Sequence, residues 1–251
     1  MQAIILAAGV GNRLGVQGEN PKSLLVLDGE TLLSRHLTEL AKYQVTRVTL
    51  CVGYREEQLR AAAVYSGLAI ECVTNSDFRR GSVVSLWSVR AALACGESVL
   101  LMDADVLYSA QVLETLVASP HANCFLLDRD FVPGDEPVKL RVRGDRLVEF
   151  RKRPDPAIPF DFQGESVGFF KFSPACAREL AQRCDAYVAS GRLDEAYEEP
   201  IRDLVLAATQ PLAFEDISGL PWIEIDFPED IVRAEREVLP KIARPIGSSN
   251  A

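Results

Sequence analysis

A segment near the N-terminus places small residues and two cations at spacings that suit phosphate binding. It reads Leu6-Ala7-Ala8-Gly9-Val10-Gly11-Asn12-Arg13-Leu14 and is followed by Pro21-Lys22. Small side chains and two glycines allow backbone N–H groups to approach an anion closely, as in the concave nests that bind phosphates. The chain has a net charge of −9, so a phosphate site needs cations gathered locally. Arg13 and Lys22 meet that need, and we predict that the segment binds phosphates.

Other glycine-containing motifs fit this segment less well. A dinucleotide-binding fingerprint requires a third glycine where Leu14 stands, and an acidic residue after the second long strand, where Val52-Gly53-Tyr54 occurs. A phosphate loop is excluded because no Gly-Lys-Ser/Thr sequence opens a helix here. The plain structural alternative is a tight turn with two surface cations.

Two acidic pairs lie at the ends of predicted strands. Asp103 and Asp105 are separated by one residue, which points both side chains to the same face of a strand. Two such carboxylates repel unless a cation separates them, and a hard divalent ion bound by carboxylates and substrate phosphates fits. Glu224 and Asp226 repeat the pattern near the C-terminus. The alternatives are a turn cap for Asp103 and an edge strand with solvated acids for the second pair.

Two lysines could support such a site, whereas the histidines show no sign of chemistry. Lys139 lies within a predicted strand, and Lys152 lies in the basic run Arg151-Lys152-Arg153. For both, a surface lysine with a buried stem is the alternative. His36 and His121 have no partner at a suitable spacing, so we interpret them as structural. No Ser/His/Asp or Cys/His set indicates a covalent nucleophile.

The elements that would position these residues alternate between buried strands and amphipathic helices in the first half of the chain. Strands that are apolar on both faces and separated by helices predict a parallel sheet covered on both sides. Ligands of such sheets bind beyond the carboxyl ends of the strands, where the glycine segment and the first acidic pair lie. The expected strands are 3–7, 47–52, 68–74, 98–102 and 123–127, and the expected helices are 31–43, 56–65, 82–93 and 110–118.

After residue 128 the pattern changes to antiparallel strands. Two short strands flank a turn signal and predict a hairpin, so we expect one α/β domain whose later third adds a small antiparallel lid. The domain is predicted to span 1–244, and the tail at 245–251 is predicted to fray. The expected later elements are strands at 139–142, 147–150 and 166–172, a helix opened by Ser173 and Pro174, a short strand that ends at Asp226, and a helix at 228–238.

Composition narrows the class of protein. Hydrophobic residues make up 48% and charged residues 25%, which is typical of a globular protein. No stretch approaches the ~20 apolar residues of a membrane helix, and the N-terminus lacks the basic flank of a signal peptide. The six cysteines have no paired spacing, which predicts free thiols in a reducing cytoplasm. The net negative charge does not indicate a positively charged surface for binding duplex nucleic acid.

The glycine segment followed by Pro21-Lys22 resembles the signature of the nucleotidyltransferases that make sugar nucleotides and CDP-alcohols. The resemblance implies a Rossmann-like, mostly parallel mixed sheet sandwiched by helices, the GT-A-like fold. It implies a nucleotide-binding half at 1–130 and an acceptor-binding half at 131–244 that includes the metal strand. It also implies Arg13 and Lys22 on the phosphates, with Lys139 as a further catalytic cation. The residues implied to wrap the nucleotide are Leu6, Ala7, Ala8, Gly9, Gly11 and Asn12, and those implied to hold Mg²⁺ are Asp105, Glu224 and Asp226.

The segment from Asn75 to Trp87 resembles the phosphocholine and aminoethylphosphonate cytidylyltransferase branch, which implies CTP as the nucleotide. On the acceptor side, Lys152 resembles a phosphate-binding lysine, and Glu165 lies in Gly164-Glu165-Ser166-Val167-Gly168, which resembles a substrate-recognition turn. The residues implied for the base are Asn75, Gly81 and Ser82.

An acidic cluster around Tyr197 allows two interpretations. Asp194, Glu195, Glu198 and Glu199 are typical of a solvated helix face. If they instead line the acceptor pocket, the carboxylates with Tyr197 or Trp87 would suit a cationic head group.

The leading hypothesis is a cytidylyltransferase that joins CTP to a small phosphorylated alcohol or phosphonate with Mg²⁺ and releases pyrophosphate. A sugar-1-phosphate nucleotidyltransferase that uses UTP, dTTP or GTP is the next alternative. A nucleotide-sensing module without turnover and a dinucleotide-dependent oxidoreductase are weaker alternatives.

Overall fold

The computed structural model describes residues 1–11, 13–14, 20–65 and 67–242. Two predictions lie outside these residues, namely the nucleotide contact of Asn12 and the frayed tail at 245–251. In the described chain no helix is long and apolar enough to span a membrane.

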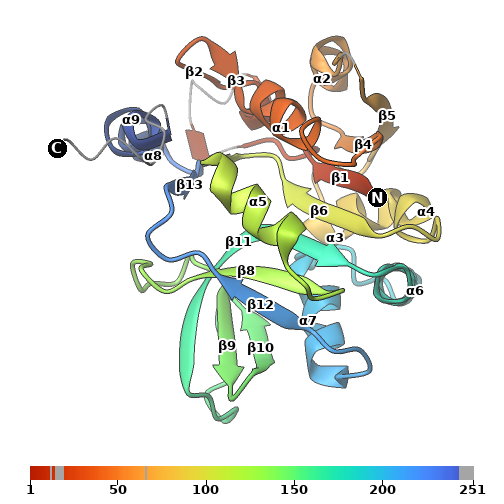
Figure 1. Cartoon of the computed structure of the whole chain (residues 1–251). Helices are drawn as coiled ribbons and strands as arrows, with labels where there is room; N and C mark the ends of the chain where they lie inside the picture. Colours follow the sequence, from red (N-terminus) through yellow and green to blue (C-terminus); the bar gives the residue numbers. More distant parts are fainter. Residues whose placement is uncertain (12, 15–19, 66, 243–251) are drawn as a thin grey trace, which may run out of the picture.

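Four parallel strands form one half of a nine-stranded sheet (Figure 1). Their order is β6-β1-β4-β5, and Leu6 at the end of β1 lies level with both Cys51 and Asp103. The carboxyl end of β1 is therefore beside the first acidic segment, as the predicted parallel sheet requires. The four strands are β1 (Gln2–Leu6), β4 (Arg47–Val52), β5 (Ala69–Thr74) and β6 (Val99–Asp103).

The other half of the sheet is built around one long strand, β11 (Phe162–Phe172), which runs antiparallel to β6. β11 also pairs with β8 (Cys124–Asp128) and β9 (Lys139–Arg143), β9 forms a hairpin with β10 (Arg146–Arg151), and β12 (Ala213–Asp216) runs parallel to β8. The predicted antiparallel lid is thus continuous with the main sheet. The expected turn at 164–168 is instead part of β11, where the register shifts between Ser166 and Phe170.

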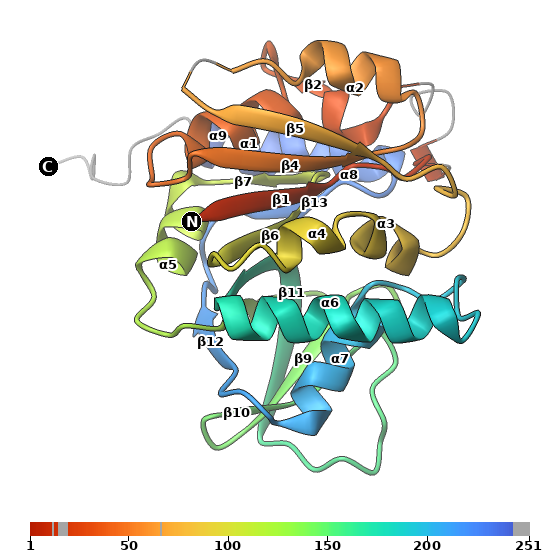
Figure 2. The same ribbon diagram turned by 90° about the vertical axis from the view of Figure 1, so that its right-hand side faces the viewer.

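Helices cover both faces of the sheet, because side chains of each strand alternate between two cores. Ile4 packs in one core with residues of α3, α4, α6 and α7, whereas Ala3 and Ile5 pack in the other with residues of α1 and α5. α6 runs alongside α3 and α4 (Figure 2). The helices are α1 (Leu32–Leu40), α2 (Glu56–Ala62), α3 (Ser82–Ser88), α4 (Arg90–Leu93), α5 (Ala110–Ala118), α6 (Pro174–Ala189), α7 (Glu198–Ala207), α8 (Pro228–Arg233) and α9 (Leu239–Ile242).

The predicted α/β fold with a mixed sheet flanked by helices is confirmed, with local differences. The helix expected at 82–93 is interrupted at Val89, whose backbone (φ −95°, ψ 13°) separates α3 from α4. The last helix continues through a π-helical turn at Ala234–Val238 into α9. Four short strands pair in two small ladders, β2 (Val26–Leu27) with β3 (Glu30–Thr31) and β7 (Val106–Tyr108) with β13 (Trp222–Glu224).

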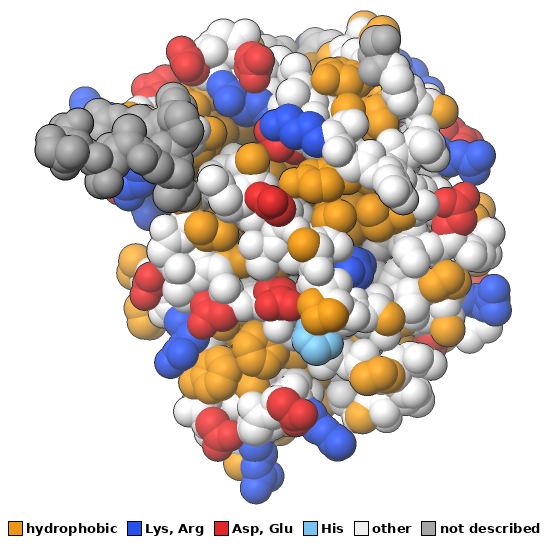
Figure 3. Space-filling view, viewed as in Figure 1, with side chains coloured by type: hydrophobic (Ala, Val, Ile, Leu, Met, Phe, Trp, Pro, Cys, Tyr) orange, Lys and Arg blue, Asp and Glu red, His pale blue; other side chains and the backbone are white. Residues whose placement is uncertain are grey.

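The molecular surface mixes charges of both signs. On the face seen in Figure 3, Lys and Arg side chains are interspersed with Asp and Glu, and hydrophobic side chains lie between them.

A buried ion pair joins α7 to the β9–β10 hairpin. Arg202 of α7 donates from Nε and Nη2 to the two carboxylate oxygens of Glu149, at 2.5 and 2.8 Å, and Glu149 is fully buried. Burial alone would raise the pKa of Glu149, but hydrogen bonds from Arg202 and from the Phe150 backbone hold it below its usual range. This pair fixes the helix that begins next to Tyr197.

We therefore expect Arg202→Met to destabilise the protein by about 3 kcal/mol or more, because it leaves a buried carboxylate without its counter-ion. Urea unfolding followed by circular dichroism measures this change. The double variant Glu149→Met/Arg202→Met should recover at least half of the loss, and Lys42→Met, which removes a surface pair with Glu39, should cost less than about 1 kcal/mol. A loss of that smaller size for Arg202→Met would show that the pair with Glu149 does not stabilise the fold.

Candidate active site

A pocket of about 420 Å³ lies beyond the carboxyl ends of β1 and β6. Residues from both halves of the sheet line it, and most of the predicted site residues are among them. The predicted residues in the lining are Leu6, Ala7, Ala8, Gly9, Gly11, Arg13, Lys22, Ser82, Asp105, Lys152, Tyr197, Glu224 and Asp226.

The glycine segment forms one wall of the pocket with its backbone. The Ala7 N–H donates to the Cys51 carbonyl, and the Ala8 carbonyl accepts from the Tyr54 N–H, so the segment is tied to the end of β4. Gly11 has φ +67°, and a Cβ there would lie 2.9 Å from Cγ of Lys22. A glycine at this position therefore allows both the left-handed backbone and the close approach of the lysine.

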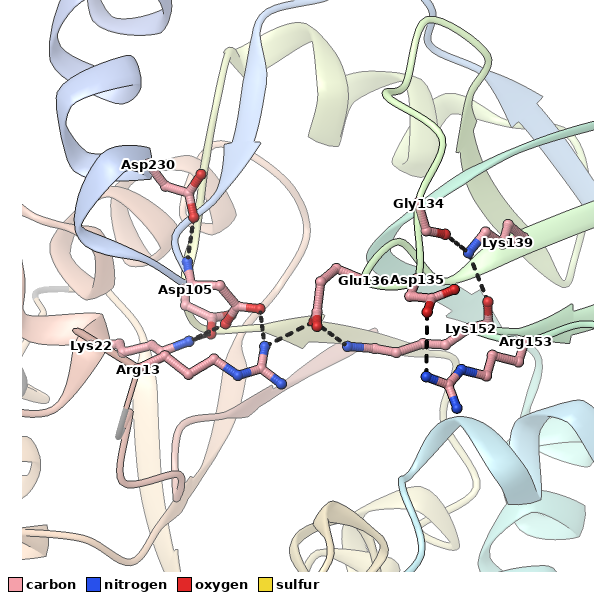
Figure 4. A network of polar contacts seen from close by, with 11 residues as sticks. Arg13, Lys22, Asp105, Gly134, Asp135, Glu136, Lys139, Lys152, Arg153 and Asp230 are labelled. Carbon is pink, nitrogen blue, oxygen red and sulfur yellow. Dashed lines mark hydrogen bonds and ion pairs between the residues drawn. The ribbon is translucent and has the colours of Figure 1, made fainter. Parts of the chain in front are cut away.

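Two cations of this wall contact carboxylates on the opposite wall. Lys22 Nζ lies 3.0 Å from Asp105 Oδ2 and 2.5 Å from Asp226 Oδ1, and Arg13 Nη1 lies 3.0 Å from Asp226 Oδ2 (Figure 4). Burial alone would lower the pKa of Lys22, but the charges of Asp105 and Asp226 raise it above its usual range, so the ammonium stays protonated. Burial would raise the pKa of Asp226, yet Lys22 and Arg13 hold it below its usual range.

Three acids predicted as metal ligands meet in this pocket. Carboxylate oxygens of Asp105, Glu224 and Asp226 lie within 4.8 Å of one another. The pairing of β7 with β13 brings them together, because Val106 is opposite Glu224 and the Ile225 N–H donates to the Asp105 carbonyl at 2.9 Å.

This cluster has the chemistry of a divalent cation site. Desolvation and the negative charges of Asp105 and Asp226 raise the pKa of Glu224 well above its usual range, so a cation would relieve the crowding. Carboxylate oxygens are the ligands that Mg²⁺ prefers, and this set therefore fits that ion.

Asp103, for which a turn cap was one expectation, is instead bonded to Tyr197. The Tyr197 hydroxyl donates to Asp103 Oδ2 at 2.5 Å. Burial and the charge of Asp105 raise the pKa of Asp103 well above its usual range, although the hydrogen bond from Tyr197 opposes the rise. Gly168 of β11 passes directly over this carboxylate with φ +76°, and a Cβ there would overlap Asp103 Oδ2. The sheet can therefore accommodate Asp103 only beside a glycine.

The end of the pocket near α3 contains hydroxyl groups. Ser82 and Ser85 line it, and the buried side chain of Asn75 donates to Ser85 Oγ at 3.0 Å. Asn75 thus lies behind the lining. Gly81 also lies outside the lining, where its Cα faces the Glu195 backbone so closely that a Cβ would overlap it.

Two buried oxygens in the lining lack a hydrogen-bond partner among the described residues. They are Ser23 Oγ and Glu198 Oε2. Buried polar atoms in folded proteins are nearly always bonded, so these two are exceptions at the wall of the pocket.

Besides Asn75 and Gly81, three more of the predicted residues lie outside this lining, namely Lys139, Trp87 and Glu165. The Lys139 ammonium donates to the carbonyls of Gly134 and Lys152, and thereby holds the backbone next to Lys152. Trp87 lies on the surface, where its indole N–H donates to Asp185 at 2.9 Å and its ring stacks with Arg90. These partners, rather than a ligand, satisfy both groups.

Glu165 lines a second pocket, also about 420 Å³, that shares Glu224 and Asp226 with the first. Burial and the charge of Asp128 raise the pKa of Glu165 to about 7. The two pockets thus meet at the acidic cluster.

Sequence reasoning did not propose five residues of the first pocket, namely Ser23, Phe78, Arg80, Ser85 and Ala104. The solvated-helix interpretation of the acidic cluster at 194–199 is wrong for two of its members. Glu198 faces the pocket, and Glu199 is buried and accepts from Arg151 at 2.7 Å. A partial signal was available in Arg151, a cation directly after the strand predicted at 147–150.

A family model described as the MobA-like NTP transferase domain matches residues 3–200. Among curated proteins, a CMP-5'-(3-aminopropyl)phosphonate synthase from Streptomyces rubellomurinus is 30% identical over 245 residues, which cover 94% of this chain and 38% of the relative. A bifunctional IPC transferase and DIPP synthase from Rubrobacter xylanophilus is 28% identical over 240 residues, which cover 94% of this chain and 52% of the relative. The chain therefore spans about half of these relatives' length or less.

Solved structures share the fold. The inositol-1-phosphate CTP transferase from T. maritima has a TM-score of 0.76 and 23% identity, with 96% of this chain and 95% of that chain covered. The CTP:phosphocholine cytidylyltransferase from Streptococcus pneumoniae has a TM-score of 0.72 and 21% identity, with 93% and 97% covered. These likenesses show that the mixed sheet and its helices are arranged as in nucleotidyltransferases.

The close contact at Gly168 generates a stability prediction. We expect Gly168→Ala to destabilise the protein by about 3 kcal/mol, since it adds both left-handed strain and overlap with Asp103. Gly144→Ala is the matched control, because Gly144 also has a positive φ (+61°) but open space at its Cβ, and it should cost about 1 kcal/mol. Urea unfolding measures both, and equal losses would contradict the close packing of β11 on Asp103.

Proposed function

Since the chain belongs to the MobA-like NTP transferase family, we propose that it is a Mg²⁺-dependent cytidylyltransferase. It joins CTP to a small phosphorylated alcohol or phosphonate, releases pyrophosphate, and forms a CDP-alcohol or CMP-phosphonate. The observation that carries this proposal is the opposition of Arg13 and Lys22 to three clustered carboxylates across one pocket.

The proposed reaction brings several anions together, so its main requirement is charge neutralisation. An oxygen of the acceptor phosphate or phosphonate attacks the α-phosphorus of CTP in line, and the bond from that phosphorus to the pyrophosphate oxygen breaks. Arg13 and Lys22 offset the repulsion and stabilise the charge that develops on the leaving pyrophosphate. The attacking oxygen is already ionised, so no general base is needed.

Asp105, Glu224 and Asp226 are the residues that would hold Mg²⁺ in this scheme. Mg²⁺ when bound supplies neutralisation of the triphosphate and helps to orient it. The chain's own groups do the remaining work, since the backbone of the glycine segment and the two cations position the phosphates.

CTP is proposed as the nucleotide on two grounds. The segment 75–87 resembles the cytidylyltransferase branch, and several relatives carry cytidylyl activities in their names, among them a choline-phosphate cytidylyltransferase from Haemophilus influenzae that is 30% identical over 132 residues. Ser82 and Ser85 lie where their hydroxyl groups could form hydrogen bonds with the nucleotide base. Asn75 fixes the orientation of Ser85. Ser82 remains our proposed base contact, whereas Asn75 and Gly81, which lie outside the lining, can only support it from behind.

The second pocket supports an acceptor with a cationic end. Asp128 and Glu165 line it together with the rings of Phe131 and Trp222, and the Trp222 indole N–H donates to Asp128 at 2.7 Å. Carboxylates beside aromatic rings favour ammonium groups, whereas a neutral polyol would leave these charges unpaired. With Lys152 near the acceptor phosphate, the geometry favours phosphocholine or an aminoalkylphosphonate.

A sugar-1-phosphate nucleotidyltransferase remains the second candidate. A UTP–glucose-1-phosphate uridylyltransferase from Haloferax volcanii is 25% identical over 250 residues, covering 95% of this chain and 96% of the relative. A nucleotide-sensing module would not need the clustered carboxylates, which argues against it.

An activity assay tests the proposed function. The protein is incubated with CTP, UTP, dTTP or GTP, with Mg²⁺, and with phosphocholine, 2-aminoethylphosphonate, inositol 1-phosphate or glucose 1-phosphate, and pyrophosphate release is followed. We expect release with CTP and an amine-bearing acceptor, and none when EDTA removes the metal. Asp105→Ala should lower the rate by about 10³-fold because it deletes a metal ligand.

Asp145→Ala is the control, because Asp145 is exposed in the β9–β10 turn and lies outside the first pocket. It should retain the wild-type rate. Release confined to UTP or dTTP with glucose 1-phosphate would replace the cytidylyl proposal by the second candidate, and unchanged turnover of Asp105→Ala would refute the proposed metal site.

The raised pKa of Glu165 predicts a pH dependence of acceptor binding. Because its carboxyl has a pKa of about 7, it is charged above that pH and neutral below it. The KM for an amine-bearing acceptor should therefore rise about fivefold as the pH falls from about 8 to about 6. The acceptor phosphate titrates in the same range, so Glu165→Gln is the control. It should flatten the profile, and an identical slope in the variant would exclude this role.

A further inference from the structure

One carboxylate lies between two cations that line the first pocket, where the nucleotide is proposed to bind. Glu136 Oε2 accepts from Arg13 Nη1 at 3.0 Å and from Lys152 Nζ at 3.4 Å (Figure 4). Glu136 lies in the segment that joins β8 to β9, whereas Arg13 follows β1 and Lys152 follows β10. Three separate parts of the chain thus meet at a single carboxylate oxygen.

Arg13 also pairs with Asp226 at 3.0 Å, whereas among the described residues Lys152 forms an ion pair with Glu136 alone. All three side chains are about half exposed, at 47% for Arg13, 43% for Lys152 and 56% for Glu136. Exposed ion pairs contribute little free energy and exchange partners easily. Lys22, by contrast, is held between Asp105 and Asp226 with only 15% exposure.

We infer that Glu136 is an internal competitor of the triphosphate: it occupies Arg13 and Lys152 until the phosphates of the nucleotide displace it. A triphosphate carries several negative charges and many acceptor oxygens, so it outcompetes one exposed carboxylate for the same two cations. The inference rests on the proposed function in that the ligand bears a triphosphate.

Displacement also changes the neighbouring pocket. Glu136 lines the second pocket, in which the cationic end of the acceptor is proposed to lie. Once released from Arg13 and Lys152, its carboxylate is left without a cation at the edge of that pocket. Binding of the nucleotide therefore increases the negative potential that an ammonium group meets there.

The next residue along the chain provides a matched control. Asp135 pairs with Arg153 at 3.3 Å, and both side chains are about four-fifths exposed, at 79% and 81%. Asp135→Asn removes the same charge from the same segment as Glu136→Gln does, but leaves the contacts to Arg13 and Lys152 in place. A general gain in positive potential would affect both variants, whereas release of the two cations affects only Glu136→Gln.

The experiment measures binding by isothermal titration calorimetry with two probes, inorganic tripolyphosphate and CTP, each with Mg²⁺. Glu136→Gln should bind both about three- to tenfold more tightly than the wild type, and Asp135→Asn should bind them like the wild type. Equal or weaker binding of tripolyphosphate by Glu136→Gln, equal tightening in both variants, or no binding by any of the three proteins would overturn the inference.

The two probes separate this inference from the proposed function. If the wild type binds tripolyphosphate but not CTP, the cytidylyl proposal fails, and the comparison of the variants with tripolyphosphate still decides the role of Glu136. If the wild type transfers cytidylyl groups but Glu136→Gln shows no tightening, the proposed function stands and the inference fails.

Discussion

The short ladder between β7 and β13 is the contact on which the site depends. It consists of the pairs from Trp222–Tyr108 to Glu224–Val106, continued by the hydrogen bond from the Ile225 N–H to the Asp105 carbonyl. Without it, the acids at the end of the chain would lie apart from the acid that follows β6. Backbone pairing therefore holds together carboxylates that repel one another, and Lys22 between Asp105 and Asp226 offsets part of that repulsion.

The electrostatic organisation of the pocket follows from that enforced proximity. An acidic protein has gathered carboxylates at one point, and it stabilises them with cations from the glycine segment. Lys22 is held between two acids with little exposure, whereas Arg13 and Lys152 are about half exposed and share Glu136, with Arg13 also on Asp226. The pocket is thus neutralised by contacts of graded strength, which suits a site where phosphates must enter and pyrophosphate must leave.

Much of this architecture could be predicted from the sequence, because buried strands and amphipathic helices leave a regular pattern of apolar residues. The glycine segment was predicted from its small residues and two cations, and the grouping of Asp105, Glu224 and Asp226 at one metal site was implied by the family resemblance. Contacts that depend on long side chains could not be predicted. The contact between Arg151 and Glu199 and the contact between Trp87 and Asp185 each join residues that are far apart in the sequence. They depend on how the helices pack in the folded protein, and the spacing of residues along the chain does not encode that packing.

β11 is hydrogen-bonded along one edge to β6, which carries Asp103, and elsewhere to β9, which leads to the acceptor side. A single continuous strand thus sets the distance between the two pockets, and close-packed interiors resist changes of such distances. For the acceptor proposed above, this fixed separation would add a geometric requirement: the spacer between its anionic head and its cationic end would have to match the distance between the two pockets, so homologous compounds that differ by one methylene would be distinguished by length as well as by charge.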